Sequence, residues 1–254
     1  MKRAMLAIGI LTAVWLAGCQ ANDAPPRAGG GGIGGGGGSV NRSPKGQTLE
    51  IPPQSDDYVS FEGGVKVYPA LKRMEVEARL LGGQRRPLEF LIVGPGGAAH
   101  EALFTVTARA EHIKRGLEII GLKEAKEKFI GRGYREKPQG DAIKLSVRFA
   151  RSDNGKEAMV RVEDWLLNGI TRASPEPGMF VFTGGQEQYL PELNRSVVSA
   201  DQYGNLAAVW HDSSCIIDNR HEHGSISDVY EPNPNAPGIP QAGTTVILVF
   251  EPEK

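Results

Sequence analysis

Cysteine is nearly absent from this sequence. Of its 254 residues only two are cysteine, Cys19 and Cys215. Cys19 belongs to a lipidation motif described below, which leaves Cys215 without a partner for an intramolecular disulfide, so the fold must be stabilised by apolar burial. One free thiol is also too few for an iron–sulfur cluster, which needs about four thiolate ligands. We therefore expect neither a disulfide nor an iron–sulfur cofactor.

Basic clusters, long apolar runs and nucleotide-binding motifs are missing as well. The formal net charge is −1, with both signs mixed along the chain, whereas binding to a nucleic-acid backbone needs clustered Lys and Arg. The apolar run from Ala4 to Leu16 is shorter than the roughly 20 residues of a membrane-spanning helix. The glycine-rich stretch at residues 94–97 lacks the Lys-Ser/Thr ending of a phosphate-binding loop, and no Gly-x-Ser-x-Gly motif occurs. We expect no nucleic-acid partner, no bound nucleotide and no serine-esterase chemistry.

The amino terminus has the pattern of a lipoprotein signal peptide. Lys2 and Arg3 precede the apolar run, and residues 16–19 read Leu-Ala-Gly-Cys, a motif that resembles the cleavage and acylation site of bacterial lipoproteins. We predict a signal peptide at residues 1–18 and lipidation of Cys19, which makes the lipid the membrane anchor. Gln20 follows the cysteine in place of Asp, a pattern associated with sorting to the outer membrane. The expected location is therefore the cell envelope, at the outer membrane and facing the periplasm.

A flexible linker is predicted between this anchor and the folded part of the chain. Nine of residues 29–38 are glycine, and residues 19–46 contain too little apolar surface to offset the entropy lost on ordering. A Gly-rich coil of this length has a root-mean-square reach of roughly 30 Å. We expect the linker to let one domain, at residues 47–254, explore a shell near the bilayer.

Alternation of apolar and polar residues predicts several strands in that domain. Residues 73–80, 143–149 and 157–163 have a period of two, which is typical of half-buried strands. Asn154-Gly155 separates the second and third of these and predicts a hairpin turn. Residues 88–93 and 245–250 are more uniformly apolar, which indicates central strands covered on both faces. Pro175, Pro177 and residues 231–240 are expected to be surface loops because proline removes a backbone donor.

One helix is predicted among these strands. The apolar face consists of Ala110, Ile113, Leu117 and Ile120. Thr107 is the expected N-cap, Lys114 and Glu118 the expected i,i+4 pair, and Gly121 the stop signal. A single main helix among many strands predicts an α+β fold class, in which a mostly antiparallel sheet packs the helix on one side.

Several short motifs occur in the order found in a known family. The motifs are Val93-Gly94-Pro95, His100-Glu101-Ala102-Leu103, Val162-Glu163-Asp164-Trp165 with Asn168, Phe180-Val181-Phe182-Thr183-Gly184-Gly185, and Ile239-Pro240 with Gly243-Thr244. The chain resembles YdjY-domain proteins over roughly residues 60–253. The family has no settled activity, so the resemblance implies an extracytoplasmic domain and no particular reaction or cofactor. Members commonly carry a lysine two residues before the His-Glu pair, where this chain has Ala98.

Two histidine motifs are the candidate functional sites. His221 and His223 can share one face of an extended segment and hold a metal ion, with Asp218, His211 or Asp228 as a third ligand. The alternative is that this polar segment is a solvated loop. His100 and Glu101 can stand at the mouth of a cleft, as polar anchor and base. The alternative is a pair whose polar groups are satisfied by the backbone.

Cys215 and the aromatic residues have simpler interpretations. Cys215 is favoured as a small buried side chain over a nucleophile. Trp165, Trp210, Phe180 and Phe182 are predicted to be core residues. We expect a lipid-anchored binding or structural module without catalysis, whose partner is an envelope protein, the cell wall or a small molecule. The alternative is a metal-binding protein or metal-assisted hydrolase that uses the histidine motifs.

Overall fold

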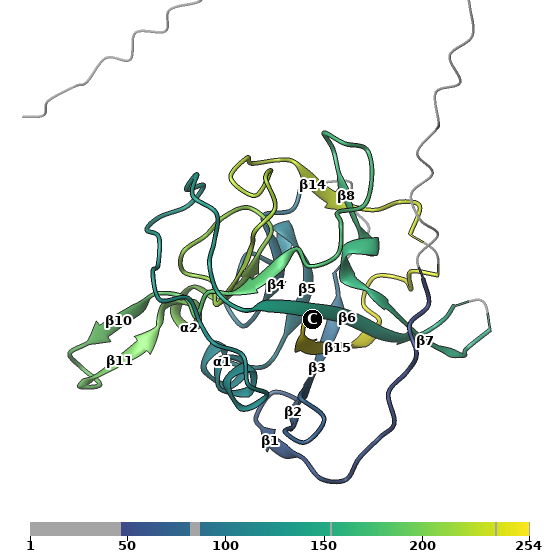
Figure 1. Cartoon of the computed structure of the whole chain (residues 1–254), viewed down its shortest axis with the longest axis horizontal. Helices are drawn as coiled ribbons and strands as arrows, with labels where there is room; N and C mark the ends of the chain where they lie inside the picture. The colour runs from purple at the N-terminus through teal and green to yellow at the C-terminus, as the bar shows by residue number, and fades with distance from the viewer. Residues whose placement is uncertain (1–46, 82–86, 153, 237, 254) are drawn as a thin grey trace, which may run out of the picture. The chain divides into compact units, whose positions relative to one another are not determined.

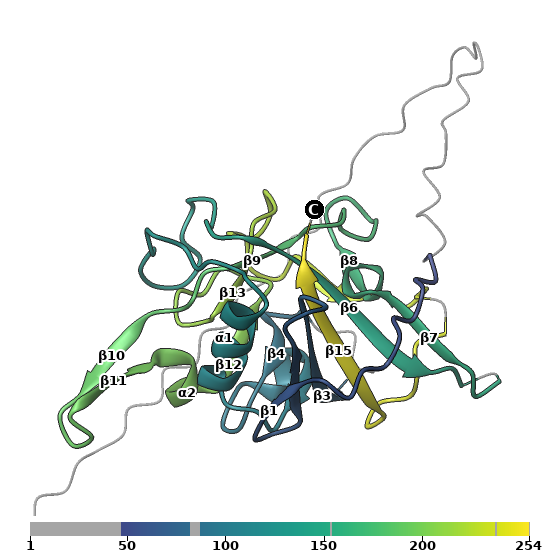
Figure 2. The same cartoon turned by 60° about the horizontal axis from the view of Figure 1, so that its bottom comes forward.

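The largest sheet among the described residues closes into a β-barrel, whose strands can be followed in Figures 1 and 2. The computed structural model describes residues 47–81, 87–152, 154–236 and 238–253, so the predicted signal peptide, Cys19 and the linker at residues 19–46 lie outside the described residues. Within the described ranges, the wall has eight strands. Their order around the barrel is β3 (Arg73–Leu80), β15 (Thr245–Pro252), β6 (Ala142–Ala150), β9 (Phe180–Phe182), β13 (Ile217–Asn219), β12 (Asn205–Ala208), β4 (Phe90–Val93) and β5 (Ala102–Val106), and β5 pairs with β3 again.

The predicted α+β fold class is wrong, because the sheet closes on itself and the fold is mostly β. One edge of β3 pairs with β15 along Met74–Arg79. The other edge is shared, since residues 73–76 pair with β2 (Val65–Tyr68) and residues 78–80 pair with residues 104–106 of β5. That second pairing joins the two ends of the sheet and removes its open edges. The interior of the barrel, rather than one helical layer, therefore covers most of the apolar side chains.

The barrel is mixed in strand direction. The pairs β4–β5 and β12–β13 are parallel, whereas the other six pairings around the wall are antiparallel. Parallel neighbours need a crossover between them. The crossover between β4 and β5 contains the glycine-rich stretch at residues 94–97 and the short helix η1 (Ala99–Glu101), and this connection contributes to the cleft described below.

Smaller elements extend from the barrel. The strand β1 (Val59–Phe61) pairs with β2, and β7 (Glu157–Arg161) pairs with β6. Two further two-stranded sheets are formed by β10 (Glu187–Leu190) with β11 (Arg195–Val198) and by β8 (Leu166–Asn168) with β14 (Tyr230–Pro232). The hairpin of β10 and β11 projects well away from the barrel in both views (Figures 1 and 2). Helices η2 (Val162–Trp165) and α2 (Ser199–Tyr203) complete the set.

The predicted hairpin at Asn154-Gly155 is confirmed. Strands β6 and β7 are antiparallel, with Ser146 opposite Arg161 and Ala150 opposite Glu157. Gly155 has a φ of 67°, which glycine adopts without steric cost. The third predicted strand ends earlier than expected, since Val162 already begins η2.

The predicted helix is present as α1 (Ala110–Ile119), and all four residues of its expected apolar face are buried. It packs against β2 and β3, where Gly116 faces Met74 and Val67 so closely that a Cβ would meet the Met74 sulfur. Gly121 follows with a φ of 95°, as the stop signal predicts.

The cap and the ion pair predicted for this helix are wrong. The N-cap residue is Arg109, and the first backbone N–H groups are instead satisfied by α2. The Asp201 carboxylate accepts from Ala110 N at 2.6 Å and from Glu111 N at 3.2 Å. The Lys114 ammonium lies 3.0 Å from Glu124 and 3.3 Å from Glu187. Glu118 pairs with Arg115 instead, at 3.0 Å.

Strand β3 is buried on both faces over its first half, contrary to the predicted alternation. Arg73 and Glu75 are only 1% and 5% exposed. The segment before β1 contributes to this burial, since Arg73 Nη2 donates to the Pro53 carbonyl at 3.1 Å. Glu75 also accepts from Arg148 of β6 at 3.0 and 3.3 Å. These ion pairs make the buried charges tolerable.

The larger of two apolar clusters in the described core includes three of the four predicted aromatic residues. Trp165 is fully buried and its ring centroid lies 5.0 Å from that of Phe149. Phe180 and Phe182 are also fully buried. Trp210 differs, because it is only half-buried and contacts an arginine at the cleft. Within the described ranges, no helix has the length and apolarity needed to cross a bilayer.

Candidate functional site

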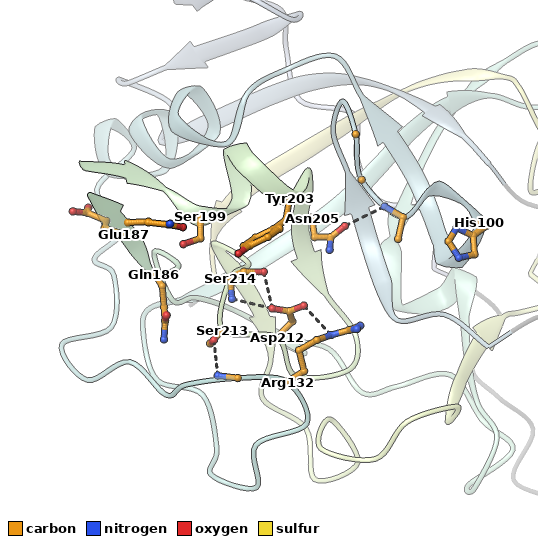
Figure 3. A pocket seen from close by; sticks show the side chains of 15 residues that line it. His100, Arg132, Gln186, Glu187, Ser199, Tyr203, Asn205, Asp212, Ser213 and Ser214 are labelled. Carbon is orange, nitrogen blue, oxygen red and sulfur yellow. Dashed lines mark hydrogen bonds and ion pairs between the residues drawn. The ribbon is translucent and has the colours of Figure 1, made fainter. Parts of the chain in front are cut away.

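A polar cleft of about 820 Å³ opens beside the barrel, between the β4–β5 connection, the base of the β10–β11 hairpin, helix α2 and the turn at residues 212–214 (Figure 3). Its walls are formed by Gly96, Gly97, Ala98, His100, Gly131, Arg132, Gln186, Glu187, Gln188, Ser199, Tyr203, Asn205, Asp212, Ser213 and Ser214. Ligand pockets of about 300–1,000 Å³ are common, but most are lined by apolar groups. Here eleven of the fifteen lining residues carry a hydroxyl, amide, imidazole or charged side chain.

Arg132 is the fixed charge of the cleft. Its Nε lies 3.1 Å from Asp212 Oδ2, and its Nη2 forms an ion pair with Glu89. The guanidinium carbon lies 4.6 Å from the ring centroid of Trp210 and 5.5 Å from that of Phe90. Two carboxylates and two aromatic faces therefore hold one planar cation in a single orientation.

Asp212 organises the turn on the other side of this ion pair. Its Oδ1 accepts from Ser214 Oγ at 2.6 Å and from Ser214 N at 2.9 Å. The hydroxyl of the intervening residue, Ser213 Oγ, accepts from Gly131 N at 2.9 Å. Figure 3 shows Arg132, Asp212, Ser214, Tyr203 and Asn205 near the centre of the cleft, with His100 and Glu187 at opposite ends.

Two glycines allow the turn after β4 and the end of α2 to approach each other closely and form the other wall of the cleft. Gly97 and Gly204 approach so closely that a Cβ on Gly97 would lie 2.4 Å from the Gly204 carbonyl oxygen. Gly94 N donates to that same oxygen at 2.7 Å, and Ala98 N donates to Asn205 Oδ1 at 3.2 Å. The turn after β4 is thus fastened to the end of α2, which carries Tyr203.

Of the predicted His100–Glu101 pair, only His100 stands at this cleft. His100 lines it, with a side chain 68% exposed and its Nε2 3.5 Å from Glu101 Oε1. Glu101 lies against Glu89, the partner of Arg132. Burial raises the pKa of Glu101, and the hydrogen bond and charge of the adjacent Glu89 raise it further. Neither Glu89 nor Glu101 is part of the cleft wall. Glu89 forms an ion pair with Arg132, and the charge of Arg132 lowers the pKa of Glu101.

The predicted metal ligands lie elsewhere. His223 Nδ1 is 3.0 Å from the Asn168 side-chain nitrogen, while burial and the nearby cations Arg220 and Lys137 lower the pKa of His221. His211 has both ring nitrogens occupied, at 2.6 Å from the Tyr134 carbonyl oxygen and 2.7 Å from the Asn219 carbonyl oxygen.

A metal site with three protein ligands is not formed by the described ranges. Within residues 47–81, 87–152, 154–236 and 238–253, no three His, Cys, Asp or Glu side chains come together in a way that could hold a metal ion. The geometry therefore supplies no third ligand for the predicted pair His221 and His223.

Cys215 follows the cleft residue Ser214 but is fully buried. It packs in a small apolar cluster with Phe90, Val93 and Ala208. Burial raises the pKa of its thiol well above the ordinary value, which disfavours the thiolate that a nucleophile requires.

Most residues of the cleft could not be predicted from the sequence. Arg132 and Asp212 meet in an isolated bridge between two irregular segments. Tyr203 is the last residue of the five-residue helix α2, and Asn205 is the first residue of β12. None of them belongs to a local motif. His100 is an exception, because the sequence places it at the mouth of a cleft, and Ala98 is another, because the His-Glu motif draws attention to its position; both line the cleft.

The fold is a mixed β-barrel with a polar cleft beside it. The family model of the YdjY domain matches residues 65–251. The chain therefore belongs to the YdjY-domain family. No curated protein and no solved structure matches the chain.

Proposed function

We propose that this protein is a binding module of the cell envelope whose cleft takes a neutral ligand rich in hydroxyl and amide groups, of the size of a disaccharide. The observation that carries the proposal is the composition of the cleft wall. Four hydroxyl side chains, at Ser199, Tyr203, Ser213 and Ser214, are joined there by the amides of Gln186, Gln188 and Asn205. Such groups donate and accept hydrogen bonds at once, as the hydroxyl groups of a sugar do.

The charges of the cleft also favour a neutral ligand. Arg132 and Asp212 neutralise each other across 3.1 Å, and Glu187 is engaged by Lys114. A strongly charged ligand would compete with these pairs. Tyr203 adds an aromatic surface that is 57% exposed, against which the apolar face of a sugar ring can pack.

The arrangement supports binding better than catalysis. Ser214 Oγ donates to Asp212, but that carboxylate is already held by Arg132, which makes it a poor acceptor for the proton of a nucleophile. Neither carboxyl group of the acid pair Glu101 and Glu89 lines the cleft. The metal-dependent alternative would need a third ligand beside His221 and His223.

The lipoprotein motif supports the proposed location. Cleavage before Cys19 and acylation of that residue would place the domain at a membrane surface of the envelope, and the glycine-rich linker would let the cleft reach roughly 30 Å from the bilayer. A glycan of the cell wall is a ligand that such a tethered module would meet. An envelope protein that presents the same hydroxyl and amide groups is the other partner class.

The test is to titrate the full-length chain in detergent with the disaccharide of N-acetylglucosamine and to measure the heat of binding by calorimetry. We expect saturable binding that weakens about tenfold or more in Tyr203→Ala. Tyr189→Ala is the matched control, because Tyr189 is 56% exposed on β10 but does not line the cleft. No binding by the wild type, or equal loss in both variants, would refute the proposal.

A further inference from the structure

A second and separate cavity lies beneath helix η2. It has a volume of about 260 Å³ and is lined by Gln47, Leu49, Arg161, Glu163, Asp164, Ser174, Pro175, Glu176 and Pro177. The first described residues form part of its wall, and Leu49 N is fastened to the Met159 carbonyl oxygen at 2.7 Å. None of these residues belongs to the polar cleft.

Glu163 is the residue that makes this cavity unusual. The residue is 1% exposed, and its Oε1 accepts from Gly178 N at 3.0 Å and from Met179 N at 3.3 Å. Its Oε2 is buried and has no hydrogen-bond partner among the described residues. A buried acceptor without a donor is costly, so that a carboxyl oxygen left in this state beside a cavity calls for a ligand that donates.

The charges around the cavity select the sign of that ligand. Asp164 and Glu176 add two more carboxyl groups to the wall. The one cation among the lining residues, Arg161, is already bound on both nitrogens by Glu253, at 2.9 and 2.7 Å. The charge of Arg161 lowers the pKa of Glu163 and of Asp164, but the wall still holds three carboxyl groups against this one cation.

The apolar part of the wall selects the shape of the ligand. Leu49, Pro175 and Pro177 line the cavity together with the carboxyl groups, which suits an aliphatic stem. A bare metal ion fits less well, because the described residues contain no group of three side chains that could hold one. A cavity of this volume has room for the stem and head group of one lysine-like side chain.

We propose that this cavity binds a primary ammonium group on a short aliphatic stem. The ammonium donates to Glu163 Oε2 and to the Asp164 carboxylate, while the stem packs against Leu49 and the two prolines. The proposal is independent of the function assigned to the polar cleft. Burial raises the pKa of Glu163 to about 7, so its carboxyl is readily ionised when a cation enters.

The proposal is tested by titrating the full-length chain in detergent with n-butylammonium at pH 7.5. Nuclear magnetic resonance detects the binding. The uncharged probe 1-butanol has nearly the same shape. We expect saturable binding of butylammonium and binding of butanol that is weaker by at least about tenfold. Failure of butylammonium to bind, or equal affinity for the two probes, overturns the proposal.

Three variants locate the site. Glu163→Gln and Asp164→Asn are each expected to weaken butylammonium binding, the first by at least about tenfold, and Asp164→Asn keeps the test usable if the buried variant does not fold. Tyr203→Ala, in the polar cleft, is expected to bind butylammonium like the wild type. Unchanged affinity in both carboxyl variants would place the bound ammonium elsewhere and refute the site.

Discussion

The hydroxyl of Tyr134 donates a 2.6 Å hydrogen bond to Oδ2 of Asp218, a carboxyl that is completely buried. The same oxygen accepts from the backbone N–H of the cleft residue Asp212 at 3.2 Å, and Oδ1 accepts from Asn219 N at 2.7 Å. Burial raises the pKa of Asp218 to about 8 in spite of these three donors. The backbone of the cleft residue Asp212 is therefore held by a buried acid, and hydrogen bonds stabilise the ionised form of that acid.

Tyr134→Phe should destabilise the protein more at alkaline than at neutral pH. The hydroxyl stabilises the ionised form of Asp218, so its removal raises the folded-state pKa further and costs most where the carboxyl is charged. We expect a loss of about 1–3 kcal/mol at pH 9 and a smaller loss at pH 6, from urea unfolding at both pH values. Tyr58→Phe, which changes an exposed hydroxyl, is the control. A loss that is the same at both pH values would contradict this role.

Arg132→Gln should affect both stability and the polar cleft. The change leaves Asp212, whose side chain is 7% exposed, without its ion-pair partner. Because the arginine side chain is 46% exposed, solvent moderates the cost, and we expect a loss of about 1–2 kcal/mol in unfolding free energy. Disaccharide binding should weaken as well, since the turn at residues 212–214 loses its anchor. Arg115→Gln, on the exposed face of α1, serves as the comparison in the same thermal and binding measurements.

Asp201→Ala should destabilise the start of helix α1, although Asp201 belongs to helix α2. Asp201 provides the only side-chain acceptor found for the first N–H groups of α1 among the described residues. Loss of a cap costs about 1–2 kcal/mol, and its negative charge at the helix N-terminus adds to the effect. Asp201→Asn keeps one oxygen and should cost less. Hydrogen exchange of residues 110–113 reports the change directly, and unchanged protection in Asp201→Ala would refute the assignment.

Local features of this fold could be predicted from the sequence, whereas its closure could not. The hairpin at Asn154-Gly155 and the buried face of α1 depend on residues within a few positions of one another. The pairing of Ala78 with Val106 depends on where a distant strand ends. Alternation indicates that a strand has two faces, but not which strand lies beside it. The sheet could therefore be predicted, but not that it closes into a barrel.

The polar cleft escaped prediction for the same reason. Arg132 and Asp212 are far apart in sequence and meet outside the regular strands, and each alone is an ordinary charged residue. His100 could be placed at a cleft because it belongs to a motif between two strands. The buried charge of Glu75 could not be foreseen either, since an alternating pattern assigns it to solvent and its burial depends on Arg148 from another strand.

Glu163→Gln should make the protein more stable than the wild type at pH 8, and this advantage should be smaller at pH 5. Burial raises the pKa of Glu163 from an ordinary 4.5 to about 7. The folded state therefore holds this proton more tightly than the unfolded state. The stabilisation is complete below pH 4.5 and is lost as the pH rises to about 7. A shift of this size corresponds to about 3 kcal/mol, which glutamine, being neutral, does not lose.

Urea unfolding at half-unit steps from pH 4.5 to pH 8 measures this difference, in the absence of any amine that would bind the carboxylate. We expect the difference in unfolding free energy to move in favour of Glu163→Gln across that interval and to level off above about pH 7. Glu176→Gln is the control, since it removes an exposed carboxyl of the same cavity. A constant difference between Glu163→Gln and the wild type would mean that Glu163 is already ionised at pH 5, with a donor on Oε2 that stabilises its charge.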